Sequence, residues 1–291
     1  MRKFLPIILL VVLVVFGWWL LTPPEEPPEI SPEAKQLRVH FINVGQGDST
    51  LIQTPDGRII LVDAGDSNSG EQVVDYLRRL GISRIDLLVI SHPHEDHIGG
   101  LVSVFDNLGV SCVVDRGWEF ASPIYEQVLT RIKERRIDYR CVDKDSLPVL
   151  SKDTQIEFLC PWPVHSGGSE SAVNNGSIVV VVRYKQVSFL LTGDIQLEAE
   201  AQLLGKYRDL QTTVLKVAHH GSSDSTSNEL LQVTKPAYAV ISVGAGNPYG
   251  HPSRVILRRL RAAGTKVYRT DVNGNIIFST DGEVVKVDTE K

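Results

Sequence analysis

Ten consecutive residues, Ser91–Gly100, gather three histidines and two acidic side chains in the order S-H-P-H-E-D-H-I-G-G. They directly follow the mainly apolar run Ile85–Ile90, which is typical of a buried strand. The cluster is therefore expected at the carboxyl end of that strand, where open α/β sheets bind their ligands. Because side chains alternate along an extended chain, His92 and His94 can point to the same side.

Asp96 and His97 follow where the chain turns into a helix, so they point to a second position close to the first. Neutral imidazole and carboxylate together suit Zn²⁺, Mn²⁺ or Fe²⁺, and two such clusters make a two-metal site. The alternative is a polar helix entry in which Asp96 is the cap and the histidines are merely solvated. A single histidine would favour that alternative, whereas the pattern H-x-H-x-D-H favours metal binding.

The stretch S-H-P-H-E-D-H-I-G-G resembles the signature of the metallo-β-lactamase superfamily of binuclear metallohydrolases. Two further stretches, Asn43–Asp48 and Leu215–Ser222, are similar to the branch that includes the hydrolase domain of the competence protein ComEC. The similarity covers the chain from about Leu37 to Asp288. It implies an α/β fold, a four-layer αββα sandwich, that binds two divalent metal ions, zinc or manganese.

The resemblance also implies a set of metal ligands. They divide between two sites: His92 and His94 for one metal, Asp96, His97 and His220 for the other, and Asp194 for both. Asp194 as a helix cap is the alternative, but its place at a strand end opposite the first cluster favours a ligand. Asp63 corresponds to an aspartate that supports the metal loop without binding metal. His220 fits the last ligand better than His219, which becomes a supporting or core-facing residue.

One ligand that the superfamily often has is missing here. Its members often supply a further histidine to the first metal, and Asn174–Ser177 stands in that place. Asn175, Ser177 or water must then complete the shell, and oxygen donors shift the preference from Zn²⁺ towards Mn²⁺. His165 is the nearest histidine, but its neighbours give no argument for its orientation. We therefore expect one tightly held metal and one that dialyses away.

Two further elements are candidates for contact with the substrate. The tight turn that contains Gly45, Gly47 and Asp48 is a candidate backbone cradle for an anion. His251 lies in the rigid turn Pro248–Pro252 and is expected to contact the substrate or to pass a proton to the leaving group. With Asp96 and Asp194, His251 completes the predicted catalytic residues.

The implied reaction is attack on phosphorus or on a carbonyl by a hydroxide held between two metals. The first hypothesis is a membrane-anchored, extracytoplasmic phosphodiesterase of the ComEC-like type, acting as a nuclease on incoming DNA or as an esterase on surface phosphodiesters. The second is a non-catalytic module that binds nucleic acid or a partner. The nearly complete ligand set favours the first hypothesis, and the missing histidine favours the second. A separate channel or competence protein is an expected partner, because one spanning segment cannot form a channel.

The amino-terminal stretch Phe4–Leu21 is almost wholly apolar and just long enough to cross a bilayer. Arg2 and Lys3 precede it, which predicts that the amino terminus is inside and the rest of the chain outside the cell. The expected organisation is a transmembrane signal-anchor (1–22), a Pro/Glu-rich linker (23–36) and a hydrolase domain (37–291). A cleaved signal peptide and a secreted protein are the alternative.

The overall charge offers no strongly basic domain, since 30 Lys and Arg face 35 Asp and Glu. The basic clusters Arg131–Arg136 and Arg254–Arg261 are interpreted as solvated faces of amphipathic helices. The chain has three cysteines without C-x-x-C spacing, so buried thiols are expected. One disulfide-bonded pair in an oxidising compartment remains the alternative.

Other patterns predict the elements around these residues. Ser49–Thr54 and Arg58–Asp63 should form a hairpin, and a helix should run from about Ile98 to about Leu108. Pro161–Gly176 is predicted as a loop over the site. The strands expected between Lys266 and Asp288 should close the second sheet.

Overall fold

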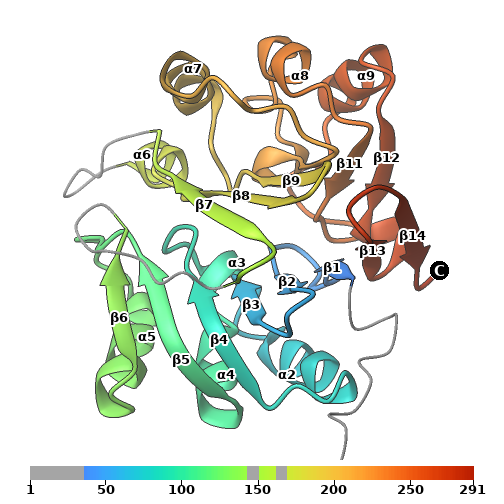
Figure 1. The fold of residues 1–291 in the computed structure, drawn as a ribbon. Coiled ribbons are helices and arrows are strands. Elements are labelled where there is room, and N and C mark those ends of the chain that lie inside the picture. The colour runs from blue at the N-terminus through green and yellow to red at the C-terminus, as the bar shows by residue number, and fades with distance from the viewer. Residues whose placement is uncertain (1–35, 143–150, 162–168) are drawn as a thin grey trace, which may run out of the picture. The chain divides into compact units, whose positions relative to one another are not determined.

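Two β-sheets lie face to face in this protein, and helices cover the outer face of each sheet (Figure 1). The computed structural model describes residues 36–142, 151–161 and 169–291. The predicted transmembrane segment, nearly all of the predicted linker and His165 lie outside these ranges. Within them, no helix combines the length and the hydropathy that a membrane span requires. Gln36 and the described residues after it belong to one compact unit.

The first sheet contains eight strands in the order β14-β13-β1-β2-β3-β4-β5-β6. They are β1 (Leu37–Phe41), β2 (Thr50–Gln53), β3 (Ile59–Val62), β4 (Arg84–Val89), β5 (Gly109–Asp115), β6 (Asp138–Cys141), β13 (Ile276–Thr280) and β14 (Val285–Thr289). Strands β3 to β6 are parallel, and the other neighbours pair antiparallel. The predicted hairpin is the antiparallel pair β2 and β3.

The second sheet contains six strands in the order β12-β11-β10-β9-β8-β7. They are β7 (Gln155–Leu159), β8 (Val179–Tyr184), β9 (Val187–Leu191), β10 (Val214–Lys216), β11 (Tyr238–Ile241) and β12 (Lys266–Arg269). Strands β9 to β12 run parallel, so their carboxyl ends meet at one edge of the sheet. The loops that leave this edge face the loops that leave β3 and β4 of the first sheet (Figure 1).

Longer helices form the two outer layers, and short ones lie at the strand ends. The elements are α2 (Gly70–Arg79), α3 (Glu95–Ile98), α4 (Leu101–Asn107), α5 (Pro123–Glu134), α6 (Glu170–Asn175), α7 (Leu197–Lys206), η2 (Ala218–Gly221), α8 (Asn228–Thr234), α9 (Arg254–Ala262) and α10 (Thr270–Asn273). Leu77 and Phe105 help to pack α2 and α4 on the first sheet. Leu203 and Leu260 pack α7 and α9 on the second. The predicted four-layer αββα order is confirmed (Figure 1).

An aromatic cluster holds the inner faces of the two sheets together. The ring of Phe278 in β13 lies 5.9 Å from that of Phe41 in β1 and 6.0 Å from that of Phe189 in β9, both edge to face. This geometry is favourable for aromatic pairs, in addition to the area they bury. All three side chains are fully buried. Strands from the beginning, middle and end of the described chain therefore meet in one core.

The carboxyl-terminal strands correct one sequence prediction. Only β12 extends the second sheet, whereas β13 and β14 belong to the first, beside β1. In β13, buried residues alternate with half-buried ones, and Ile276 and Phe278 point into the core between the sheets. Pairing with β1 buries this face and also covers an edge that would otherwise expose unpaired backbone groups.

The helix predicted from Ile98 to Leu108 is interrupted, because α3 ends at Ile98 and α4 begins at Leu101. Gly99 and Gly100 lie between them against neighbouring backbone. A Cβ atom on Gly100 would lie 2.1 Å from the carbonyl oxygen of Ala64. The close approach requires glycine, and it packs the metal loop against the end of β3.

The stretch Pro161–Gly176, predicted as a loop, contains a short helix in its described part. Ser169 caps α6, since its Oγ accepts the N–H of Ala172 at 3.3 Å. A serine that looks like a loop residue in the sequence is thus a helix N-cap. The helix positions Asn174 and Asn175 beside the candidate site.

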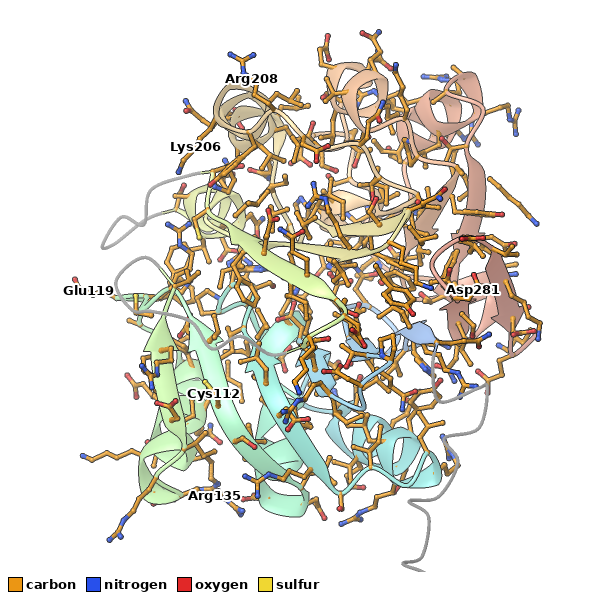
Figure 2. The ribbon with its side chains drawn as sticks, viewed as in Figure 1. Cys112, Glu119, Arg135, Lys206, Arg208 and Asp281 are labelled. Carbon is orange, nitrogen blue, oxygen red and sulfur yellow. The ribbon has the colours of Figure 1, made fainter. Side chains whose placement is uncertain are left out.

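The basic cluster on α5 lies on an exposed helix face, as its pattern predicts. Arg131 and Arg135 both form ion pairs with Asp106, at 3.1 and 3.0 Å. Figure 2 shows Arg135 on the outer helical layer of the first sheet. Cys112, labelled in the same view, lies in β5 as a buried free thiol.

A buried ion pair joins the two sheets next to the candidate site. Lys216, at the end of β10, pairs with Asp48 from the loop between β1 and β2. Both residues are almost fully buried. Burial alone lowers the pKa of Lys216, but the carboxylates of Asp48 and Asp194 outweigh it and raise that pKa. The lysine therefore stays charged, and the pair fixes the Asp48 loop to the second sheet.

We expect Lys216→Met to destabilise the metal-free protein by about 3–5 kcal/mol, because it leaves the Asp48 carboxylate buried without its cation. The double variant Asp48→Asn/Lys216→Met should be clearly more stable than the single variant. Urea unfolding in the presence of a chelator measures both.

The control is Lys286→Met, which removes a pair with Asp288 at 3.1 Å in which the lysine side chain is 73% exposed. It should cost about 1 kcal/mol or less. If the double variant loses as much stability as Lys216→Met, or more, the two charges are not coupled in the way described.

Candidate metal centre

A pocket of about 460 Å³ at the carboxyl ends of strands from both sheets is lined by six of the predicted site residues: His94, Asp96, Asp194, His219, His220 and His251. In the first sheet, Asp63 follows β3 and the histidine motif follows β4. In the second, Asp194 follows β9 and His220 follows β10. The parallel strands of each sheet deliver their polar residues to the same edge, so the two groups meet across the pocket.

Four side chains converge on one point. Asp96, His97, Asp194 and His220 each place a ligand atom within 4.8 Å of the others. Oδ2 of Asp194 lies 3.3 Å from Nε2 of His97 and 3.4 Å from Nε2 of His220. Nε2 of His220 lies 3.1 Å from Oδ2 of Asp96. Two carboxylates and two imidazoles in this arrangement are a donor set for a divalent metal ion.

His92 and His94 form a second group beside the first. Nε2 of His92 lies 3.0 Å from Nδ1 of His94 and 4.0 Å from Oδ2 of Asp194. The backbone at His94 is extended, and the two rings lie on the same side as the alternation predicts. The Asp194 carboxylate therefore lies between the two histidine groups.

Several buried polar atoms of the centre have no hydrogen-bond partner among the described residues. They are Nε2 of His94, Nε2 of His97 and Oδ1 of Asp194. Each unsatisfied buried group costs about 1–3 kcal/mol. Divalent cations held by the two histidine groups would give such atoms partners, so the residues fit bound metal ions.

Opposite charges shift the pKa values of the centre in opposite directions. Burial alone lowers the pKa of both His97 and His220, but the carboxylates around them outweigh burial. They raise the pKa of His97 well above its ordinary value and that of His220 to about 10. Burial alone would raise the pKa of Asp194, whereas His220 and His97 hold it well below the usual range. Without a metal, protons on these imidazoles balance the carboxylates, and a dication can replace them.

The rings of His97 and His220 are oriented by partners on their other nitrogen. Nδ1 of His97 lies 2.8 Å from Oδ2 of Asp63, and Nδ1 of His220 lies 3.0 Å from the carbonyl oxygen of Ser242. Asp63 also accepts the N–H and the hydroxyl of Ser91. Each Nε2 is thereby left facing the Asp194 carboxylate, which is how outer partners usually orient metal-binding histidines.

The backbone at three of these residues is left-handed. Asp63, His219 and His220 have φ angles of 58°, 49° and 51°. For residues other than glycine this conformation costs about 1–3 kcal/mol each and persists where the surroundings fix it. Strand β10 ends at Lys216, and η2 carries both histidines. The turn directs His220 into the pocket.

Asn175 and Ser177, predicted as possible oxygen donors to the first metal, make other contacts in the structure. Oδ1 of Asn175 accepts the N–H of Gln196 at 2.8 Å. Oγ of Ser177 accepts the N–H of Asp194 at 3.1 Å and lies 3.3 Å from Nδ1 of His92. Both residues thus hold the loop that carries Asp194.

The glycine turn before β2 packs against the metal loop. A Cβ atom on Gly47 would lie 2.2 Å from the carbonyl oxygen of Asp96, whereas one on Gly45 would meet nothing within 4 Å. The N–H of Asp48 donates to the same Asp96 carbonyl oxygen at 3.1 Å. Gln46, which stands between the two glycines in the sequence, lines the pocket. The turn thus holds the backbone of Asp96 in place. Its role as a backbone cradle for an anion stays a prediction.

His219 and His251 both line the pocket on the side of the second sheet. Their rings lie 5.9 Å apart, and the ring of Tyr249 stacks on that of His251 at 5.8 Å. Nδ1 of His219 lies 3.3 Å from Oδ1 of Asp224, which turns the other ring nitrogen away from Asp224. These rings form a wall of the pocket next to the metal centre.

The sequence interpretation overlooked several residues that contact or line the centre: Lys216, Glu170, Asn174, Asp224 and Tyr249. A lysine inside the apolar stretch Thr213–Val217 was a usable signal, since a buried lysine needs a charged partner. Glu170 and Asn174 are four residues apart and share a helix face, but this spacing has meaning only once α6 is known to be a helix.

Comparison with known sequences agrees with this geometry. The family model described as "Metallo-beta-lactamase superfamily" matches residues 42–245. ComE operon protein 3 of Bacillus subtilis is 32% identical over 82% of this chain and 32% of its own length. Competence protein ComA of Neisseria gonorrhoeae is 33% identical over 86% of this chain and 33% of its own length. The chain thus spans about a third of these curated relatives, and the predicted resemblance to ComEC-like competence proteins is confirmed.

Solved structures share the fold at low sequence identity. Igni18, described as a metallo hydrolase of Ignicoccus hospitalis, has a TM-score of 0.54 and 17% identity, and the match covers 83% of this chain and 98% of that one. YhfI of Bacillus subtilis, described as a metallo-beta-lactamase fold protein, has a TM-score of 0.52 and 12% identity, with 84% and 100% covered. By its sequence match and by the arrangement of its sheets, this chain belongs to the metallo-β-lactamase superfamily.

Proposed function

We propose that this protein is a metal-dependent phosphodiesterase that binds two divalent ions, zinc or manganese, and cleaves DNA. The observation that carries the proposal is the position of Asp194, whose Oδ2 lies 4.0 Å from His92, 3.3 Å from His97 and 3.4 Å from His220. One carboxylate oxygen that faces both histidine groups is suited to bridge two ions. The resemblance to the ComEC-like branch, in which one relative is named a competence protein, is the reason for proposing DNA as the substrate.

In this proposal the chain's own residues divide the work. His92 and His94 would hold one ion, Asp96, His97 and His220 would hold the other, and Asp194 would contribute to both. When bound, the ions supply an activated water and stabilise the negative charge that develops on the phosphate. His251 faces the pocket and donates a proton to the leaving oxygen.

The pocket mouth carries a surface for a nucleobase. Tyr249 is 67% exposed, and its ring is nearly parallel to that of His251, at an angle of 19°. Both residues line the pocket together with Phe120. Exposed aromatic rings stack on the bases of single strands without regard to sequence. This wall supports a nucleotide-containing diester over a small surface phosphodiester.

We propose further that residues 1–22 anchor the protein in the membrane and that the hydrolase domain is extracytoplasmic. The apolar run Phe4–Leu21 with Arg2 and Lys3 before it supports this orientation. A separate channel or competence protein would then be the partner that moves DNA.

Asp194→Asn should remove most phosphodiesterase activity while the domain stays folded. The neutral amide cannot balance two ions, but the apolar strand β9 before it is unchanged. Activity on single-stranded DNA, metal content and circular dichroism are measured together.

The matched control is Asp209→Asn, the same exchange at a carboxylate that is 82% exposed and pairs with Arg183. It should keep full activity. A wild-type protein that binds metal and DNA but cleaves no diester would instead favour the non-catalytic binding module. An Asp194→Asn variant with normal metal content and normal turnover would contradict the bridging role.

Tyr249→Ala should lower kcat/KM on single-stranded DNA by about 5- to 150-fold, mainly through KM, since a stacked base contributes about 1–3 kcal/mol. The effect on methyl p-nitrophenyl phosphate, which has no base, should be much smaller. Tyr249→Phe keeps the ring and serves as the control. Equal losses on both substrates would show that Tyr249 does not recognise a base.

Protease added to intact cells should remove the hydrolase domain, because the proposed orientation places it outside. A cytoplasmic protein probed in the same sample is the control for cell integrity. Complete protection of the domain in intact cells, with digestion only after lysis, would show the opposite orientation.

A further inference from the structure

A buried amide without a partner lies where the superfamily resemblance predicts a histidine. Asn174 is only 5% exposed, and its Oδ1 has no hydrogen-bond partner in the described part of the chain. It lines the same pocket as His94 and Asp194. An unsatisfied buried amide oxygen is costly, so a ligand that accepts its lone pair is expected nearby.

The helix geometry of α6 shows which way this amide faces. Glu170 and Asn174 are one turn apart and therefore share a face of the helix. Oε2 of Glu170 lies 3.6 Å from Nε2 of His94, so this face looks towards the first histidine group. Asn175 is about 100° further round the helix. Its Oδ1 accepts the N–H of Gln196 instead.

We propose that Oδ1 of Asn174 is the third protein ligand of the first metal, beside His92, His94 and the shared Asp194. The inference rests on the proposed two-ion centre and names the donor that replaces the absent histidine. Nε2 of His92, which lies 3.0 Å from Nδ1 of His94 and 4.0 Å from Oδ2 of Asp194, marks the position of the other donors of this site. Asn174, His94 and Asp194 line one pocket.

A neutral amide oxygen changes the preference of the site. It is a harder and weaker donor than imidazole, and carbonyl oxygens suit Mn²⁺ better than Zn²⁺. The first site should therefore bind more weakly than the site of Asp96, His97 and His220, and it should accept Mn²⁺ at least as readily as Zn²⁺.

Glu170 is the rival donor, because its carboxylate is already close to His94. Its side chain is 90% exposed, however, so ordering it would cost side-chain entropy and give a solvated bond. Asn174 is held in place by the helix and by burial. The test must therefore separate these two residues.

The test is a Mn²⁺ titration of the chelator-treated full-length protein in detergent, with free Mn²⁺ followed by electron paramagnetic resonance. The wild type should show one tight and one weak site. Asn174→Ala should weaken the weak site about 10-fold or more and leave the tight site within about twofold. Asn174→Asp should tighten the weak site for Mn²⁺, and Asn174→His should tighten it for Zn²⁺. Glu170→Gln, which removes the charge of the rival donor, is the control.

Three outcomes would overturn the assignment: unchanged affinities in Asn174→Ala, a larger loss in Glu170→Gln, or no gain in either Asn174→Asp or Asn174→His. Melting of the metal-free variants shows whether each has folded, and the gain-of-affinity variants do not depend on a loss. The binding is measured without substrate. A protein that binds both ions as expected but cleaves no diester would refute the proposed function and leave Asn174 as a ligand.

Discussion

The candidate site depends on one buried carboxylate, Asp194, that is held between imidazoles from both sheets. A buried carboxylate is stable only when charge and hydrogen bonds compensate the loss of water. His97 comes from the first sheet and His220 from the second, and Ser177 accepts the backbone N–H of Asp194. The geometry of the centre therefore depends on how the two sheets are placed relative to each other. The aromatic contacts of Phe278 stabilise both.

The buried carboxylates of the centre are balanced by two kinds of positive charge, a lysine that stays charged and histidines that can lose their protons. Lys216 neutralises Asp48 in every state, since its pKa is raised and it is fully enclosed. Asp194 and Asp96 are instead balanced by histidines, whose protons can leave when a metal binds. The lysine beside Asp48 thus has a structural role, whereas the imidazoles beside Asp96 and Asp194 can exchange their protons for a metal ion. The ion pair that joins the sheets is therefore present without any metal.

Features that depend on residues adjacent in the chain could be predicted from the sequence, whereas contacts between distant segments could not. The motif Ser91–Gly100 and the strand before it are adjacent in the chain, so their meeting at a strand end could be predicted. The pairing of β13 with β1 could not, because it depends on a contact between distant segments. The different surroundings of Asn174 and Asn175 could not be predicted either, since neighbouring residues of a helix face different directions. That difference becomes visible only once α6 and its contact with His94 are known.

The pairing of β13 with β1 also has a consequence for how the protein is made. Leu37, the first residue of β1, pairs with Thr280 near the end of the chain. Contacts between such distant segments form slowly, because a long loop must close first. Until β13 has been synthesised, β1 keeps an open edge and the inner core lacks Phe278. A growing chain that has not yet reached β13 therefore has an unfinished first sheet, and open strand edges of this kind are prone to aggregation.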